Sequence, residues 1–136
     1  MDTEAVVRVV GSDDIVTART AGRELAARLG FSLTDLTLIA TAISELARNI
    51  TSYAGGGEIR LGVIDEADRT ALVVEAVDDG PGIADVQLAL EDGYSSGTGM
   101  GLGLPGARRL MDEFEIHSEL GHGTTVTMCK WVRRGA

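Results

Sequence analysis

Glu45 and Asn49 stand four residues apart in the segment AISELARNI, and residues of these types at this spacing could do chemistry together. At about 100° per residue, positions four apart in a helix lie one turn apart on the same side. The Glu45 carboxylate could orient or deprotonate a hydroxyl group, and the neutral oxygen of Asn49 could bind a hard cation such as Mg2+. A solvated helix face explains the same pair, so the chemical interpretation depends on what else the chain carries.

The helix that would hold this pair has a strongly aliphatic opposite side. It is expected to begin at a cap, Ser32 or Thr34, and to end near Tyr53, before the glycines of AGGG. Five aliphatic residues share the side that would face the core: Leu36, Ile39, Ile43, Leu46 and Ile50. Polar residues gather on the other side: Thr41, Glu45, Arg48, Asn49 and Ser52. The aliphatic side would anchor the helix and hold the polar side in fixed register.

Asp78 lies in the first of two glycine-rich segments, VDDGPGI at residues 77–83, which follows an expected strand. Gly80 and Gly82 permit positive φ angles and the close approach of a planar ligand. A carboxylate buried at a strand end needs a donor partner, such as an exocyclic amine. The same composition is common in ordinary turns, so this segment alone is weak support for a binding site.

The second glycine-rich segment is GTGMGLGLPG, residues 97–106, and it leads into a helix expected to start at Pro105. Its alternating glycines would expose successive backbone N–H groups, which together with a helix N-terminus make a phosphate cradle. Residues 101–106 match G-x-G-x-x-G, but no βαβ unit surrounds them and no acid follows about 20 residues later. The dinucleotide-binding fold is therefore rejected.

Thr124 belongs to GHGTTV, residues 121–126, which is expected to form a hairpin turn that enters a strand. Its hydroxyl could hydrogen-bond toward Asp78 and a base, although threonine is also an ordinary strand residue. His117 and His122 lie in or beside this hairpin without the spacing of metal ligands. The pattern supports no Ser/His/Asp or Cys/His catalytic arrangement.

Hydrophobic periodicity predicts the order β-α-α-β-β-α-loop-α-β-β, without an internal repeat or linker. The expected elements are a strand at 5–11, a helix capped by Ser12 or Asp13 and ending near Leu29, a helix capped by Ser32 or Thr34 and ending near Tyr53, strands at 58–65 and 70–78, a short helix at 84–91, a loop at 92–103, a helix at 105–113 and a second hairpin at 114–132. Hairpin-paired strands with helices grouped between them favour one mixed, largely antiparallel sheet with helices on one face. The expected fold class is an α/β (α+β) two-layer sandwich in a single domain, residues 1–136.

The composition of the 136 residues excludes several kinds of partner. A formal net charge of −9 would repel a phosphate backbone, and an aromatic content of 4% leaves little for stacking on bases, so nucleic acid is not expected to bind. No segment approaches the roughly 20 apolar residues that cross a bilayer, and neither secretion nor membrane insertion is expected. Cys129 is the only cysteine, which suits a reducing cytoplasmic compartment, and its place in a strand predicts core packing.

Taken in order along the chain, four motifs resemble those of the GHKL ATPase superfamily, which has the Bergerat fold. SELARNI is similar to the N box, DDGPGI and GTGMGLGL to two glycine boxes, the second within the ATP lid, and GHGTT to a third glycine-rich turn. Within the superfamily, ATAISELARNI, DGPGI, EDGYSS, GLPGARRLMDEFEI and KWVRR resemble the small serine-protein kinases of bacterial sigma-factor control, especially those of the stressosome. The likeness spans nearly the whole chain.

This resemblance implies roles for the polar residues of the first two motifs. Glu45 would be the catalytic base or the hydroxyl-orienting group. Asn49 would be the Mg2+ ligand, and Asp78 would accept a hydrogen bond from the adenine amine. Arg48 or Arg109 would touch a phosphate or a partner, and the sequence does not choose between them.

The glycine motifs receive implied roles in the same way. Gly80 and Gly82 would line the base pocket, and Thr124 would support the adenine end. Residues of the lid would bind the cofactor, the glycines through its phosphates: Gly97, Gly99, Gly101, Leu102 and Gly103.

The implied function is an ATP- and Mg2+-dependent serine-protein kinase that phosphorylates STAS-domain proteins of a bacterial stress-response pathway. A phosphatase activated by binding is a further implied partner. Two alternatives stay open: an anti-sigma factor kinase, which binds a sigma factor and phosphorylates an anti-sigma antagonist, and a non-catalytic nucleotide-sensing module. The ATP-site motifs do not separate the first alternative from the kinase, whereas the intact Glu45 and Asn49 argue against the second.

Overall fold

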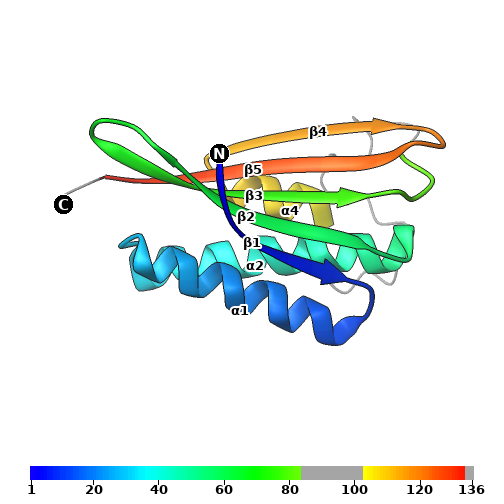
Figure 1. Ribbon diagram of the computed structural model, residues 1–136, viewed down its shortest axis with the longest axis horizontal. Helices are drawn as coiled ribbons and strands as arrows, with labels where there is room; N and C mark the ends of the chain where they lie inside the picture. Colours follow the sequence, from blue (N-terminus) through cyan, green and yellow to red (C-terminus); the bar gives the residue numbers. More distant parts are fainter. Residues whose placement is uncertain (84–102, 134–136) are drawn as a thin grey trace.

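The computed structural model describes residues 1–83 and 103–133. The strands are β1 (Asp2–Val9), β2 (Gly57–Asp65), β3 (Arg69–Asp78), β4 (Glu113–Glu119) and β5 (Gly123–Arg133). They form one sheet in the order β1-β2-β3-β5-β4, in which every neighbouring pair is antiparallel. The helices are α1 (Ser12–Arg28), α2 (Leu33–Asn49) and α4 (Gly103–Leu110), and they cover one face of the sheet (Figure 1). The predicted two-layer α/β sandwich is confirmed.

Several boundaries differ from those expected. β1 begins at Asp2 and ends at Val9, because its pairing with β2 runs from Asp2 opposite Val63 to Val9 opposite Gly57. α4 begins two residues before Pro105 and ends at Leu110, because Glu113 already belongs to β4. The expected short helix at 84–91 and residues 92–102 of the loop expected at 92–103 lie outside the described residues, and Gly103, expected in that loop, is the first residue of α4.

Asp14 closes the start of α1, so the expectation of a cap at Ser12 or Asp13 was wrong. The helix is preceded by Gly11, and the Asp14 carboxylate reaches back to accept hydrogen bonds from the amides of Val10 at 2.8 Å and Gly11 at 3.1 Å. These bonds hold the pKa of Asp14 below its usual value, the Val10 amide having the larger effect. Two otherwise unpaired donors at the strand-to-helix junction are thereby satisfied.

The ends of α2 follow the sequence signals more closely. Ser32 is the cap, and its hydroxyl oxygen accepts the amide hydrogen of Asp35 at 3.1 Å. After Asn49 the chain continues as one π-helical turn, η1 (Ile50–Ala54), and ends at Gly55 with a left-handed backbone. The amide of Gly55 donates to the Ile50 carbonyl at 3.1 Å, as expected for a glycine that terminates a helix.

The core lies between the helices and the covered face of the sheet. All five aliphatic residues predicted for the inner side of α2 are buried: Leu36, Ile39, Ile43, Leu46 and Ile50. Gly22 of α1 lets the two helices approach closely, since a Cβ there would lie 2.1 Å from Ile43 Cδ1. This packing fixes the rotation of α2 about its axis and so determines where its polar residues point.

Cys129 does not pack in this core as predicted. Its neighbour Met128 is fully buried against the helices, so the alternation of a strand turns Cys129 to the opposite face, where it is half-buried. Burial raises the pKa of its thiol, and the negative charges of Glu113 and Asp112 raise it further.

Among the described residues, no helix is long and apolar enough to cross a membrane.

Candidate functional site

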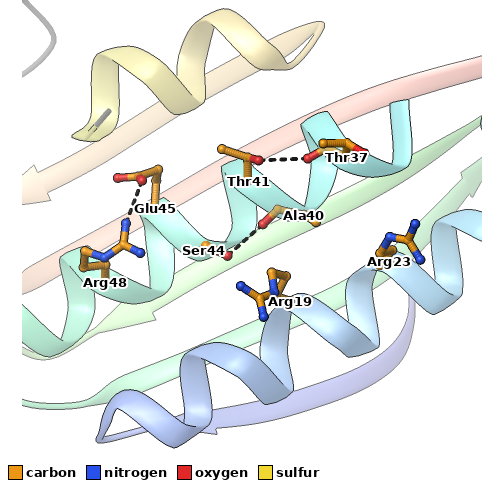
Figure 2. A pocket seen from close by; sticks show the side chains of 8 residues that line it. All are labelled: Arg19, Arg23, Thr37, Ala40, Thr41, Ser44, Glu45 and Arg48. Atoms are coloured by element: carbon orange, nitrogen blue, oxygen red, sulfur yellow. Dashed lines mark hydrogen bonds and ion pairs between the residues drawn. The ribbon is translucent and has the colours of Figure 1, made fainter. Parts of the chain in front are cut away.

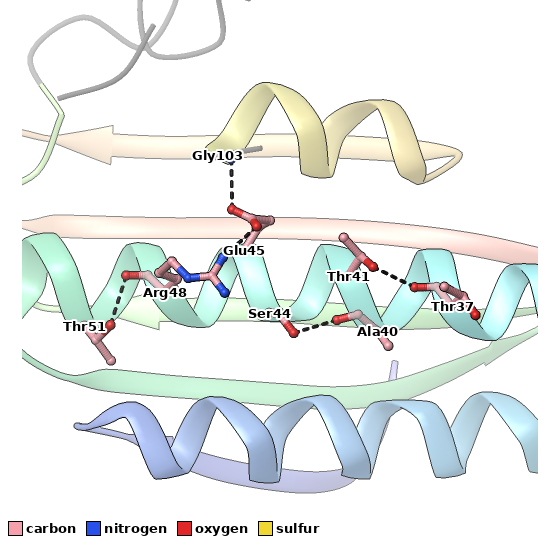
Figure 3. A network of polar contacts seen from close by, with 8 residues as sticks. All are labelled: Thr37, Ala40, Thr41, Ser44, Glu45, Arg48, Thr51 and Gly103. Carbon is pink, nitrogen blue, oxygen red and sulfur yellow. Dashed lines mark hydrogen bonds and ion pairs between the residues drawn. The ribbon is translucent and has the colours of Figure 1, made fainter. Parts of the chain in front are cut away.

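Glu45 is buried although it belongs to the polar side of α2. Its exposed fraction is 7%, because the start of α4 packs over this part of the helix. One carboxylate oxygen, Oε1, accepts from Arg48 Nη1 at 2.6 Å, and the other, Oε2, accepts the backbone amide hydrogen of Gly103 at 2.9 Å (Figure 3). Two elements thus hold one carboxylate.

Asn49 lies one turn further along α2 and ends the helix. It is half-buried, and within the described residues its carboxamide has no hydrogen-bond partner. An amide oxygen left open next to a buried carboxylate fits a hard cation. The described residues contain no group of three or more His, Cys, Asp or Glu side chains that could hold a metal ion.

Asp78 is the last residue of β3, and only one of its two carboxylate oxygens accepts a hydrogen bond from the described residues. Oδ1 accepts the amide hydrogen of Gly80 at 2.9 Å, and within the described residues Oδ2 has no partner. Thr124 of β5 is directly opposite Asp78 in the strand register, so the two side chains share a face of the sheet. The Thr124 hydroxyl bonds instead to Ser118, with 2.7 Å between Oγ1 and Oγ. The predicted proximity of Thr124 to Asp78 is present, without a direct hydrogen bond.

Gly80 and Gly82 are positioned by close packing. A Cβ on Gly80 would lie 2.7 Å from the Cβ of Ala54, which places this turn against the end of η1. Gly82 has φ +79°, and a Cβ there would lie 2.3 Å from the Glu119 carbonyl oxygen. Both glycines therefore have a structural reason to lack a side chain, in addition to the base-pocket role that the resemblance implies.

Ser118 joins the turn after β3 to the hairpin between β4 and β5, and sequence reasoning missed it. Its hydroxyl oxygen accepts the amide hydrogen of Ile83 at 2.7 Å and contacts Thr124. A second tie runs from the amide of Gly121 to the Pro81 carbonyl at 2.9 Å. One sequence signal could have identified Ser118. Inward-facing positions of β4 alternate as Phe114, Ile116 and Ser118, so a small polar residue stands where an apolar one is expected.

A groove of about 390 Å3 runs between α1 and α2 beside Glu45 (Figure 2). Arg19 and Arg23 extend from α1 toward α2, and Arg48 lies at the same groove. The hydroxyls of Thr41 and Ser44 that line it donate to carbonyls of their own helix, at 2.9 Å each, and so offer no free donor. The groove is therefore basic, in a chain whose net charge is −9.

Of the predicted lid residues, the structure describes Gly103 alone. It starts α4 with φ +65°, and its amide points to Glu45. Gly97, Gly99, Gly101 and Leu102 lie outside the described residues. Of the two arginines left open by the sequence, Arg48 contacts Glu45, and Arg109 lies exposed in the last turn of α4.

Close contacts connect the two polar pairs. Glu45 and Asn49 lie near the end of α2, where the Gly103 amide of α4 donates to Glu45. Asp78 and Thr124 lie opposite each other in β3 and β5, and Gly57 is packed between Asp78 and Ile50, the residue after Asn49. A family model described as a histidine kinase-like ATPase domain matches residues 12–130. The chain belongs to the histidine kinase-like ATPase family. Membership in this family implies that the chain binds ATP.

The chain is similar in sequence to bacterial kinase and anti-sigma proteins over most of its length. The chain is 47% identical to the serine/threonine-protein kinase RsbT of Bacillus subtilis, over 98% of this chain and 100% of that protein. It is 31% identical to an anti-sigma F factor of Caldanaerobacter subterraneus, over 86% of this chain and 85% of that one.

A crystal structure of the RsbU and RsbW domains of Rv1364c from Mycobacterium tuberculosis has the same fold. The TM-score is 0.65 at 20% identity, and the match covers 98% of this chain and 34% of that one. The similarity extends across both layers of the sandwich. At 20% identity it supports the fold and no functional assignment.

Proposed function

We propose that this domain is a cytoplasmic, ATP-dependent serine-protein kinase that phosphorylates STAS-domain regulatory proteins in a bacterial sigma-factor pathway of the stressosome type. The observation that carries the proposal is the 47% identity to the protein kinase RsbT over 98% of this chain and the whole of that protein. The geometry agrees with it, because a buried, doubly held carboxylate lies one helical turn from an open carboxamide.

We assign each polar residue of the site a role in binding Mg-ATP. Asp78 Oδ2 accepts a hydrogen bond from the adenine amine, while its other oxygen keeps the turn closed through Gly80. Asn49 would hold Mg2+ through its amide oxygen, and the bound ion would supply neutralising charge at the triphosphate. The Thr124–Ser118 pair braces the strand end beside Asp78.

Glu45 acts on the substrate serine. A carboxylate has about four lone-pair sites, so Oε1 and Oε2 can each hold their present donor and still accept a further one. The serine hydroxyl donates to Glu45 and its oxygen is aligned with the γ-phosphorus. A new bond forms between the serine oxygen and phosphorus, the bond from phosphorus to ADP breaks, and Glu45 receives the hydroxyl proton. Such transfer depends mainly on positioning and charge stabilisation, so few side chains suffice.

A second candidate function follows from the anti-sigma F relatives. The 31% identity to one of them covers 86% of this chain, which favours a protein that binds a sigma factor as well as phosphorylating an antagonist. Binding assays with purified sigma factors separate the two functions. The proposal predicts capture of STAS-domain proteins and of a phosphatase without capture of a sigma factor, whereas a stable sigma-factor complex would favour the second function.

The test of the proposed function is incubation with γ-labelled ATP and candidate STAS-domain proteins, followed by mapping of the labelled residue. We expect label on a serine of one of these proteins, retained ATP binding without transfer by Glu45→Ala, and loss of ATP binding by Asp78→Asn in calorimetry. Failure of every candidate to take up label would favour the non-catalytic nucleotide-sensing module. Undiminished ATP affinity in Asp78→Asn would contradict the assignment of the adenine end.

A further inference from the structure

We propose that Arg48 is a positioning residue that holds the Glu45 carboxylate in the orientation needed to align the substrate serine. The inference rests on the proposed kinase function and assigns a task to a residue whose role the sequence left open. Arg48 Nη1 donates a hydrogen bond to Glu45 Oε1 at 2.6 Å.

Two donors from different elements fix the plane of the carboxylate. Arg48 belongs to the last turn of α2, and the amide of Gly103 is at the first residue of α4. Because each donor takes a different oxygen, rotation of the carboxylate would break at least one of the two hydrogen bonds (Figure 3). Arg48 is the part of this clamp that a side-chain substitution can remove.

Glu45 is much more buried than Arg48, so the hydrogen bond between them constrains Glu45 more strongly. The side chain of Glu45 is 8% exposed, while that of Arg48 is 43% exposed. A carboxylate with little access to water depends on its protein donors, whereas the guanidinium keeps part of its hydration. The contact therefore acts mainly on the position of the carboxylate.

The positive charge of Arg48 also helps to keep the Glu45 carboxylate in place. A carboxylate beside a nucleotide triphosphate is repelled by it, and such repulsion would turn Glu45 away from the γ-phosphate. Arg48 places a positive charge directly on Glu45, on the side of the groove that also holds Arg19 and Arg23. The paired carboxylate can then remain in place when ATP binds.

Two other roles would explain the contact, and each makes a different prediction. An ion pair three residues apart on a helix can merely stabilise the helix, in which case only the free energy of unfolding changes when it is lost. An arginine that contacts a phosphate of ATP would change the KM for Mg-ATP. A positioning role lowers kcat at nearly constant KM for ATP.

The experiment measures transfer to a STAS-domain substrate by Arg48→Ala, Arg48→Lys and the control Arg28→Ala, with thermal unfolding of each. Arg28 stands in the last turn of α1, as Arg48 does in α2, and is exposed. We expect kcat to fall at least about tenfold in Arg48→Ala with less than about a twofold change in the KM for ATP. Arg48→Lys should recover part of the rate because it retains a charged donor, and Arg28→Ala should match the wild type.

A double variant makes the test specific to Glu45. If Arg48 acts through that carboxylate, Glu45→Gln combined with Arg48→Ala should be no slower than Glu45→Gln alone. A further loss of rate in the double variant, a KM for ATP raised more than about fivefold, or a drop in melting temperature with unchanged kcat would overturn the inference. A wild type that labels no protein refutes the kinase function itself, which is distinct from an active wild type whose Arg48→Ala variant is equally fast.

Discussion

Asp78 shows how one residue serves the fold and the site together. One carboxylate oxygen closes the turn through the Gly80 amide, and the other is open for a ligand within the described residues. The backbone of Asp78 packs directly against Gly123 of β5, where an added Cβ would lie 2.1 Å from the Asp78 carbonyl oxygen. The position of the carboxylate that we propose to bind adenine thus depends on a glycine in the neighbouring strand.

Replacing Gly123 by alanine should destabilise the protein and displace Asp78. The φ of +87° is unfavourable for alanine, and the added methyl group would collide with backbone rather than with a flexible side chain. Gly30→Ala is a matched control, since Gly30 has φ +93° and open space around it. We expect about 1 to 2 kcal/mol of lost unfolding free energy for Gly30→Ala and about 3 kcal/mol or more for Gly123→Ala.

Urea denaturation of both variants, with calorimetric titration by Mg-ATP, checks this prediction. Gly123→Ala should weaken ATP binding, and Gly30→Ala should leave it unchanged. Equal losses of stability in the two variants would show that the close approach to Asp78 has no energetic weight.

At the scale of elements, α2 supplies the site and α1 with α4 hold α2 in place. The aliphatic side of α2 packs on the sheet, Gly22 of α1 allows close helix contact, and the Gly103 amide of α4 holds Glu45. Glu45 and Asn49 therefore keep a fixed relation to the sheet edge that carries Asp78.

The start of α1 gives a prediction about pH. Because the pKa of Asp14 is lowered in the folded state, its stabilising contribution is present above the unfolded pKa of about 3.9 and is lost as the pH falls through the folded value. Asp14→Asn should therefore lower the melting temperature at pH 7, and the difference from wild type should shrink as the pH falls below about 4. Asp13→Asn removes a neighbouring charge from the same helix turn without these bonds and serves as the control. A difference of constant size from pH 7 to pH 3 would refute the role given to the carboxylate.

Across the whole molecule, the site is assembled from segments far apart in the sequence. Gly103 and Glu45 meet across 58 positions, and Ser118 reaches Ile83 across 35. Ligand binding at such a site should stabilise the entire fold, because the site exists only when these elements are docked.

Mg-ATP should therefore raise the melting temperature. At 100 times the dissociation constant, a ligand specific for the folded state stabilises it by about 2.7 kcal/mol, which corresponds to a shift on the order of 10 °C for a domain of this size. Removing Mg2+ with a chelator should reduce the shift, and Asn49→Ala should make the shift insensitive to Mg2+. Scanning calorimetry with ATP alone and with Mg-ATP measures both effects. An equal shift with and without the metal in the wild type would contradict a magnesium ligand at Asn49.

Local patterns were enough to predict much of this arrangement. The period of α2, the Ser32 cap and the hairpins are local signals, and they placed Glu45 with Asn49 and Asp78 with Thr124. The Gly103 amide on Glu45 depends on the packing of α4, which no local pattern encodes. The choice of Asp14 over Ser12 or Asp13 depends on the path from β1 into α1, and the burial of Glu45 depends on what covers the polar side of α2.

A catalytic role of Glu45 is tested most directly by single-turnover phosphoryl transfer at saturating Mg-ATP by the wild type and by Glu45→Gln, with the dissociation constant of ATP measured for both. We expect a rate at least about 100-fold lower in Glu45→Gln, at an ATP affinity within about threefold of the wild type, because the carboxylate is proposed to act on the serine rather than on the nucleotide. An unchanged rate of transfer in Glu45→Gln would contradict this role.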